Sequence, residues 1–226
     1  MLSYSLDPKL LNQLIDLFAA FILVSSFLVL AIKRLYVHVR LYATQSFFLA
    51  LVAFLVAAFG GEPHIFIAAA LTFIFKVMLI PFLFRRIINR LNVQQEAQLT
   101  LNVPASLIVA AGLVLGADYL TRTILETNQT FELSRNVLTV SLSVVLMGLF
   151  TMVTRKKALT QVIGFLTIEN GLFLAGIAIT AGMPMIVELG VLFDVLVAVF
   201  IMGVLLYRIN ETFDTINVEK LTKLKG

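Results

Sequence analysis

The chain has no cysteine and only two histidines among its 226 residues. Without cysteine it forms neither disulfides nor thiolate-bound zinc or iron–sulfur sites. His38 and His64 fall near the ends of apolar segments, where they are poorly placed to hold a haem between helices. The sequence therefore predicts no metal site, no cofactor and no catalytic residue of its own.

Charged residues are also scarce, at 13%, whereas 60% of the chain is hydrophobic. This balance excludes a disordered chain and does not fit an ordinary soluble domain. The long apolar runs do not alternate with polar residues as the strands of a membrane barrel would. The net charge of +4 needs no nucleic-acid partner, because the basic residues fall in loops. We therefore expect an all-α, polytopic helical bundle in a lipid bilayer.

The apolar runs predict about seven transmembrane helices, each near the roughly 20 residues that a bilayer requires. The first run has no basic segment ahead of it, so we interpret it as a helix and not as a cleavable signal. The predicted spans are 10–32, 41–59, 65–84, 104–124, 136–154, 159–181 and 185–207.

Lysine and arginine are distributed unevenly between the two sides of these spans. Thirteen fall in alternate loops and the C-terminal tail, three fall on the other side, and Lys76 lies within a span. Because basic residues favour the cytoplasmic side, we expect the N-terminus outside and the C-terminus in the cytoplasm.

The longest connection, about 85–103, carries a polar stretch at 94–98. Pro104 after it suits the start of a helix. We therefore divide the chain into an N-terminal three-helix part, 1–100, and a C-terminal four-helix part, 101–226.

Glu169 lies near the centre of the predicted span 159–181. A carboxylate at that depth costs about 2.5–3.5 kcal/mol on insertion scales, so it indicates a functional site facing protein or trapped water. Gly164 and Gly171 belong to a stripe of small residues on another side, which favours close helix packing. We expect that side to pack within the chain and Glu169 to face a different contact, such as another subunit. The alternative is a buried acid that only hydrogen-bonds a neighbouring helix.

Asp194 repeats this pattern in the span 185–207, with Gly190 one turn away leaving room for water or a partner helix. A buried carboxyl can take up and release protons, as a relay requires. Glu188 lies near the outer end of the same span. It fits an interfacial acid as well as it fits a proton entry or exit group.

Lys76 is a cation deep within a span, and Pro81 follows five residues later. Proline frees a carbonyl in the preceding turn and can kink the helix. A lysine in mid-membrane either pairs with a carboxylate or titrates, although it could also be structural. Together with Glu169, Asp194 and Glu188 it forms our candidate proton path.

From Arg155 to the C-terminus the chain resembles the K subunit of complex I (NADH-quinone oxidoreductase), and we treat 136–226 as a three-helix module of that kind. Over its whole length the chain resembles the hydrogenase-4 component E family of formate-hydrogenlyase-type complexes. The pieces that carry these resemblances are the basic turn 155–157, Ile163-Gly164, Glu169-Asn170-Gly171, Asp194, the tail 217–226 and the stretch from Lys76 to Pro81.

The resemblance implies a non-catalytic subunit of a hydrogenase- or complex-I-like oxidoreductase in a bacterial or archaeal cytoplasmic membrane. Its partners would be antiporter-like and complex-I-like membrane subunits, and its buried carboxylates would serve proton or cation translocation. Two alternatives remain open: a subunit of a cation/proton antiporter without a redox partner, and a structural membrane anchor.

Overall fold

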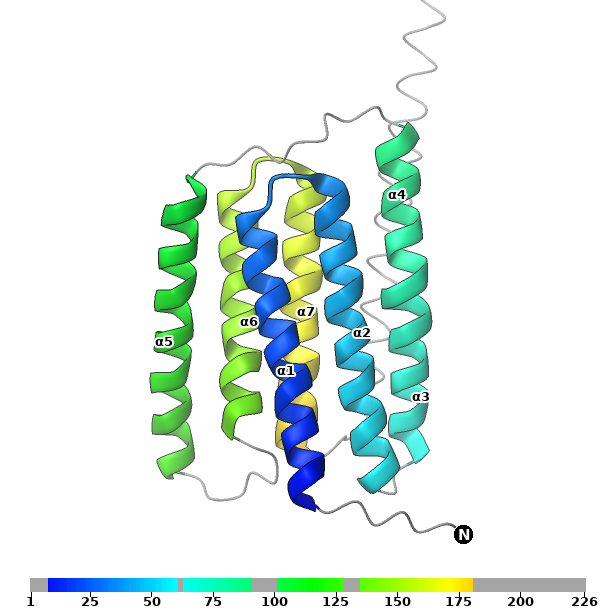
Figure 1. The fold of residues 1–226 in the computed structure, drawn as a ribbon, viewed down its shortest axis with the longest axis vertical. Helices are drawn as coiled ribbons and strands as arrows, with labels where there is room; N and C mark the ends of the chain where they lie inside the picture. The colour runs from blue at the N-terminus through cyan, green and yellow to red at the C-terminus, as the bar shows by residue number, and fades with distance from the viewer. Residues whose placement is uncertain (1–7, 61–62, 91–100, 128–134, 181–226) are drawn as a thin grey trace, which may run out of the picture.

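The computed structural model describes residues 8–60, 63–90, 101–127 and 135–180. This part of the chain is all-helical, as predicted (Figure 1). It comprises α1 (Pro8–Ala31), α2 (Leu35–Gly60), α3 (Pro63–Thr72), the π-helix η1 (Phe73–Leu79), α4 (Ile80–Arg90), α5 (Val103–Thr127), α6 (Arg135–Thr154) and α7 (Ala158–Thr180).

Six helices in the described ranges are long and apolar enough to cross a membrane, with α3, η1 and α4 forming one of them. They coincide closely with the first six predicted spans. Helix is the expected state here because a backbone in hydrocarbon must satisfy its own hydrogen bonds. The seventh predicted span, 185–207, lies outside the described residues, so the count of seven and the orientation of the termini stay predictions.

Two helices are longer than the sequence indicated. We counted Arg40 and the pair Arg85 and Arg86 as loop residues, whereas they lie on α2 and α4 with exposed side chains. On α4 they precede the buried Ile87 and Ile88. Long basic side chains can reach water from a helix whose other face is still packed, so a basic residue does not mark the end of a helix.

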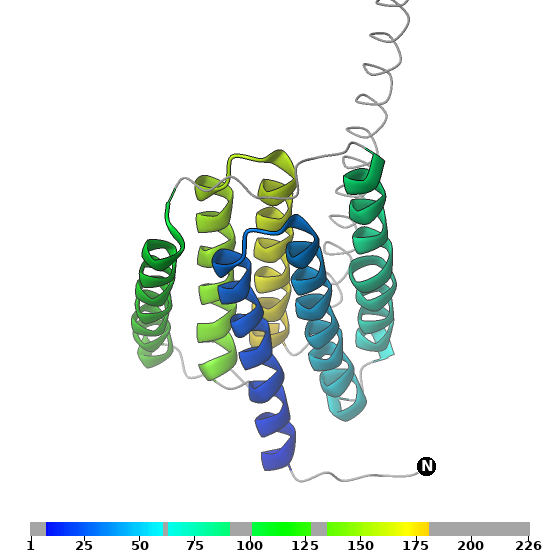
Figure 2. The same cartoon turned by 45° about the horizontal axis from the view of Figure 1, so that its top comes forward.

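The helices run alternately up and down, with α1, α2, α6 and α7 in the middle (Figures 1 and 2). α5 flanks them on one side, and α3–η1–α4 flanks them on the other. One core cluster joins Ile22 of α1 and Leu49 of α2 to Val144 of α6 and Leu174 of α7. Helices of both predicted parts therefore share a core, and the division near residue 100 stays a prediction.

At the end of the bundle that carries the basic turn 155–157, two side chains bind the last turn of α1. Arg155, between α6 and α7, donates from Nη2 to the carbonyls of Val29 at 3.2 Å and Leu30 at 2.7 Å. His38 Nε2 lies 2.9 Å from the same Val29 oxygen. Carbonyls of a last helical turn lack intrahelical partners, and a cation there is favoured by the helix dipole. Burial lowers the pKa of Arg155 to about 10, so the guanidinium stays charged at neutral pH.

Glycines bring α6 and α7 into backbone contact. A Cβ on Gly148 of α6 would lie 2.8 Å from both the Gly164 oxygen and the Ile168 nitrogen of α7. A Cβ on Gly171 would lie 2.9 Å from the Ser141 oxygen. Since these contacts are with backbone, a side chain could be admitted only by moving the helices apart.

We therefore expect Gly148→Ala to lower the free energy of unfolding by about 1–3 kcal/mol, the usual cost of overpacking. Gly112→Ala on α5 is the matched control, because a Cβ there meets nothing within 4 Å. Thermal unfolding of the detergent-purified protein measures both. Equal melting temperatures for the two variants would contradict the close packing of α6 on α7.

Candidate functional site

Lys76 and Glu169 form an ion pair in the middle of the bundle. Lys76 Nζ lies 2.9 Å from Glu169 Oε1, and the two side chains are 1% and 8% exposed. Both residues lie near the middle of their membrane-spanning helices. Each charge would be costly there alone, so the pairing explains how both are accommodated.

The π-helix η1 turns Lys76 into the bundle. The backbone N–H of Ile80 bonds to the Phe75 oxygen, five residues earlier, and Pro81 has no N–H with which to continue the α-helical pattern. Lys76 is the one buried residue of η1, while Phe73 and Met78 are exposed. Single turns of π-helix are frequent at functional sites. The proline predicted from the sequence thus coincides with a break in helical periodicity, at which one lysine faces inward.

Asn170 links this ion pair to α2. Its Oδ1 accepts from Lys76 Nζ at 3.3 Å, and its Nδ2 donates to Gln45 Oε1 and Ser46 Oγ, each at 3.1 Å. Gln45 Nε2 in turn donates to Ser26 Oγ on α1 at 2.7 Å. The site therefore spans α1, α2, η1 and α7, and all its polar residues are buried.

The two carboxylate oxygens of Glu169 have different surroundings. Oε1 receives the Lys76 ammonium, whereas Oε2 is buried and receives no hydrogen bond within the described part of the chain. The Phe173 ring, one turn further along α7, lies 5.7 Å from Lys76 Nζ, and its face adds a weaker attraction for the cation. The arrangement is a charged pair in which one carboxylate oxygen receives no hydrogen bond within the described residues, which suits proton uptake and release.

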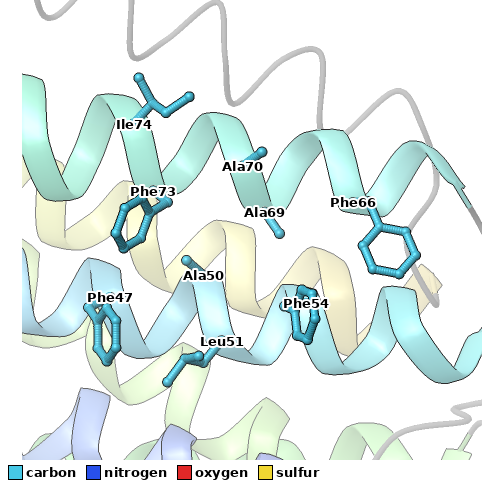
Figure 3. Close-up of a pocket in the computed structure, with 9 residues that line it drawn as sticks. All are labelled: Phe47, Ala50, Leu51, Phe54, Phe66, Ala69, Ala70, Phe73 and Ile74. Atoms are coloured by element: carbon cyan, nitrogen blue, oxygen red, sulfur yellow. The ribbon is translucent and has the colours of Figure 1, made fainter.

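An apolar hollow of about 480 Å³ lies close by between α2 and α3–η1 (Figure 3). Its lining residues are Phe47, Ala50, Leu51, Phe54, Phe66, Ala69, Ala70, Phe73 and Ile74. This lining offers no group that could exchange a proton. Within the described residues, no cluster of three His, Asp or Glu side chains could hold a metal ion.

The structure brings together two of the four residues of the predicted path, Lys76 and Glu169. We expected Glu169 to face a contact different from that of the small-residue side, such as another subunit, and its contact is with Lys76 of the same chain. Glu188, Gly190 and Asp194 lie outside the described residues. Of the predicted packing glycines, Gly164 and Gly171 lie against α6.

Gln45, Ser46 and Ser26 were missed by the sequence analysis. Their signal was an amide and hydroxyls inside otherwise apolar spans, where a polar side chain needs an internal partner. Hydroxyls often satisfy this need with their own helix, as Ser25 does by donating to the Ile22 oxygen. Only the arrangement of the helices shows which of them join the site.

Comparison with known proteins reveals two kinds of relative. Residues 136–226 match the family model for NADH-ubiquinone/plastoquinone oxidoreductase chain 4L. Hydrogenase-4 component E of Escherichia coli (strain K12) is 27% identical over 218 residues, covering 95% of this chain and 99% of its own. No solved structure gives a significant match. Both resemblances stated from the sequence are therefore confirmed.

A further relative is the uncharacterized protein Rv0085 of Mycobacterium tuberculosis, which is 32% identical over 213 residues. The match covers 94% of this chain and 96% of the mycobacterial one. With such identity over almost the full length of both chains, this protein belongs to the family that holds Rv0085 and hydrogenase-4 component E.

Proposed function

We propose that this protein is an integral membrane subunit of a hydrogenase-4-like or complex-I-like respiratory complex, and that it carries part of a proton path. The observation that carries the proposal is the buried Lys76–Glu169 pair, in a chain whose relatives include a hydrogenase component and a quinone oxidoreductase chain. A structural membrane anchor would need no charged pair at mid-membrane, because buried pairs contribute little net stability compared with apolar packing.

In this proposal Glu169 is the group that gains and loses the proton. When Glu169 is ionised, Lys76 holds it at Oε1, and a proton arriving at Oε2 neutralises the carboxylate and weakens its hold on the lysine. Redox chemistry in partner subunits would shift the equilibrium between ionised and protonated Glu169 by changing local charge or hydration. Asp194 and Glu188 would continue the path in the apolar segment 185–207.

The proposed setting is a bacterial or archaeal cytoplasmic membrane, with the N-terminus outside and the C-terminus in the cytoplasm. The basic turn at 155–157 and the ends of α1 and α4 lie at the same end of the bundle, which supports this orientation (Figure 1). The partners would be antiporter-like and complex-I-like membrane subunits.

The test is purification of the tagged protein from its native membrane in mild detergent. We expect a hydrogenase-like or quinone-oxidoreductase-like large subunit and antiporter-like subunits to co-purify with it. Antiporter subunits without any redox protein would support the antiporter alternative instead. Recovery of the protein alone after cross-linking in intact membranes would overturn membership of a complex.

A further inference from the structure

A one-way chain of hydrogen bonds runs from the Lys76 ammonium to the backbone of α1. Lys76 Nζ donates to Asn170 Oδ1, and Asn170 Nδ2 donates to Gln45 Oε1. Gln45 Nε2 donates to Ser26 Oγ, and the Ser26 hydroxyl donates to the Ile22 carbonyl at 3.0 Å. Every donor therefore points away from Lys76, and every acceptor points towards it.

The charge on Lys76 fixes this direction. An ammonium has donors and no acceptor, so Asn170 must turn its oxygen towards it. The amide nitrogen of Asn170 then faces Gln45, which must present its own oxygen and leave its nitrogen for Ser26. A flipped amide would set N–H against N–H at Lys76. The negative ends of three side-chain dipoles thus face the cation, and aligned bonds of this kind strengthen one another in a low dielectric.

We propose that Asn170, Gln45 and Ser26 are positioning residues that keep Lys76 charged while Glu169 takes up and releases the proton. The proposal rests on the function proposed for the Lys76–Glu169 pair. Charge-assisted hydrogen bonds are about twice as strong as neutral ones, so Asn170 Oδ1 offers the ammonium a second acceptor when the carboxylate is neutral. The pair then opens by protonation of Glu169 and not by loss of the proton from Lys76.

The same chain of hydrogen bonds does not conduct protons towards α1. Side-chain amides do not accept and pass on a proton as a hydroxyl or carboxyl does, and the chain ends on a backbone carbonyl. The α1–α2 side of the site is therefore a fixed support. In this proposal the proton enters and leaves on the side of Glu169 Oε2, which is buried and receives no hydrogen bond within the described part of the chain.

Substitutions at Gln45 in the assembled complex test this role, with proton translocation in sealed vesicles measured against pH. Lys76 faces Glu169, Asn170 and Phe173 of α7, and Gln45 and Ser46 of α2 stand one bond further away. Gln45→Leu removes the Gln45 dipole and the acceptor of Asn170 Nδ2, which weakens the support of the ammonium. The alkaline limb of the profile should therefore move to lower pH, by less than about one unit, because Gln45 bonds Asn170 and not the ammonium itself. Gln45→Glu adds a negative charge on the same side, so the limb should move to higher pH.

Ser143→Ala is the matched control. Ser143 of α6 is as buried as Ser26, and its hydroxyl donates to the Thr139 oxygen of its own helix, outside the hydrogen-bond chain. We expect it to keep the profile of the unmodified protein. Ser26→Ala should also move the alkaline limb of the pH profile to lower pH, by less than Gln45→Leu does. It replaces Gln45→Leu in the test if that variant does not assemble.

Opposite shifts from the two Gln45 variants would support the positioning role, because a merely structural residue would lower activity without moving the profile. Unshifted profiles for Gln45→Leu, Gln45→Glu and Ser26→Ala would overturn it, even if Glu169→Gln is defective. Full translocation by Glu169→Gln would instead overturn the proposed function itself.

Discussion

Glu169→Gln should assemble normally and lose nearly all proton translocation. The amide keeps the volume of the side chain, and its oxygen can still accept from Lys76 Nζ, which lies 2.9 Å from Oε1 in the native pair. It cannot carry a transferable proton. General acid–base groups contribute about 100- to 10,000-fold to a proton-transfer step, so a loss of at least 100-fold is expected. Proton uptake or release by sealed vesicles, measured beside electron transfer from the natural donor, gives the two rates.

Asp118→Asn is the matched control, because it also replaces an acid on a membrane-spanning helix by its amide. Asp118 pairs with Arg122 and Arg135 on a partly exposed surface of α5 and α6, away from the central site. We expect this variant to translocate protons at the unmodified rate. Glu169→Asp should keep part of the activity, because the acid is retained with a reach shorter by one methylene. Full translocation by Glu169→Gln would contradict the proton-transfer role and show that Glu169 only packs.

The six membrane helices of the described residues could be predicted from the sequence, because the signal for each span is local. A run of about 20 apolar residues has few alternatives to helix in lipid, and prolines in the first turns of α1, α3 and α5 mark helix starts. The ends of the helices could not be predicted in the same way. Arg40 and Arg85 carry charge without ending their helices, since exposed basic side chains are tolerated on a helix surface.

The chemistry of the site was predicted in part, and its geometry was not. Depth alone singled out Lys76 and Glu169, because charges in mid-membrane are costly. Their pairing joins residues 93 positions apart and depends on which face of η1 points inward. That face is set by a π-helical turn, which no apolar periodicity reveals. We expected Glu169 to face a contact other than that of the small-residue side, such as another subunit. Its contact is with η1 of the same chain, and the rotation of α7 against η1 that produces it cannot be read from the sequence.

Lys76→Met should destabilise the protein far more than Glu169→Gln does. Met fills much of the same space but leaves the Glu169 carboxylate buried without the cation that Oε1 now contacts. Breaking a buried pair from one side costs about 3–5 kcal/mol, because the remaining charge is uncompensated. The yield of monodisperse protein and its melting temperature in detergent measure this loss.

The double variant Lys76→Met/Glu169→Gln shows whether the two charges act as a pair. With both charges removed, most of the stability lost in Lys76→Met should return, because replacing both partners avoids the uncompensated charge. Translocation should stay as low as in Glu169→Gln, so stability and function would separate in one protein. Arg122→Met is the control: its ion pair with Asp118 is exposed and its loss should cost at most about 1 kcal/mol. If the double variant is less stable than Lys76→Met, so that the two losses add, the residues do not interact energetically, and the ion pair cannot be the centre of the site.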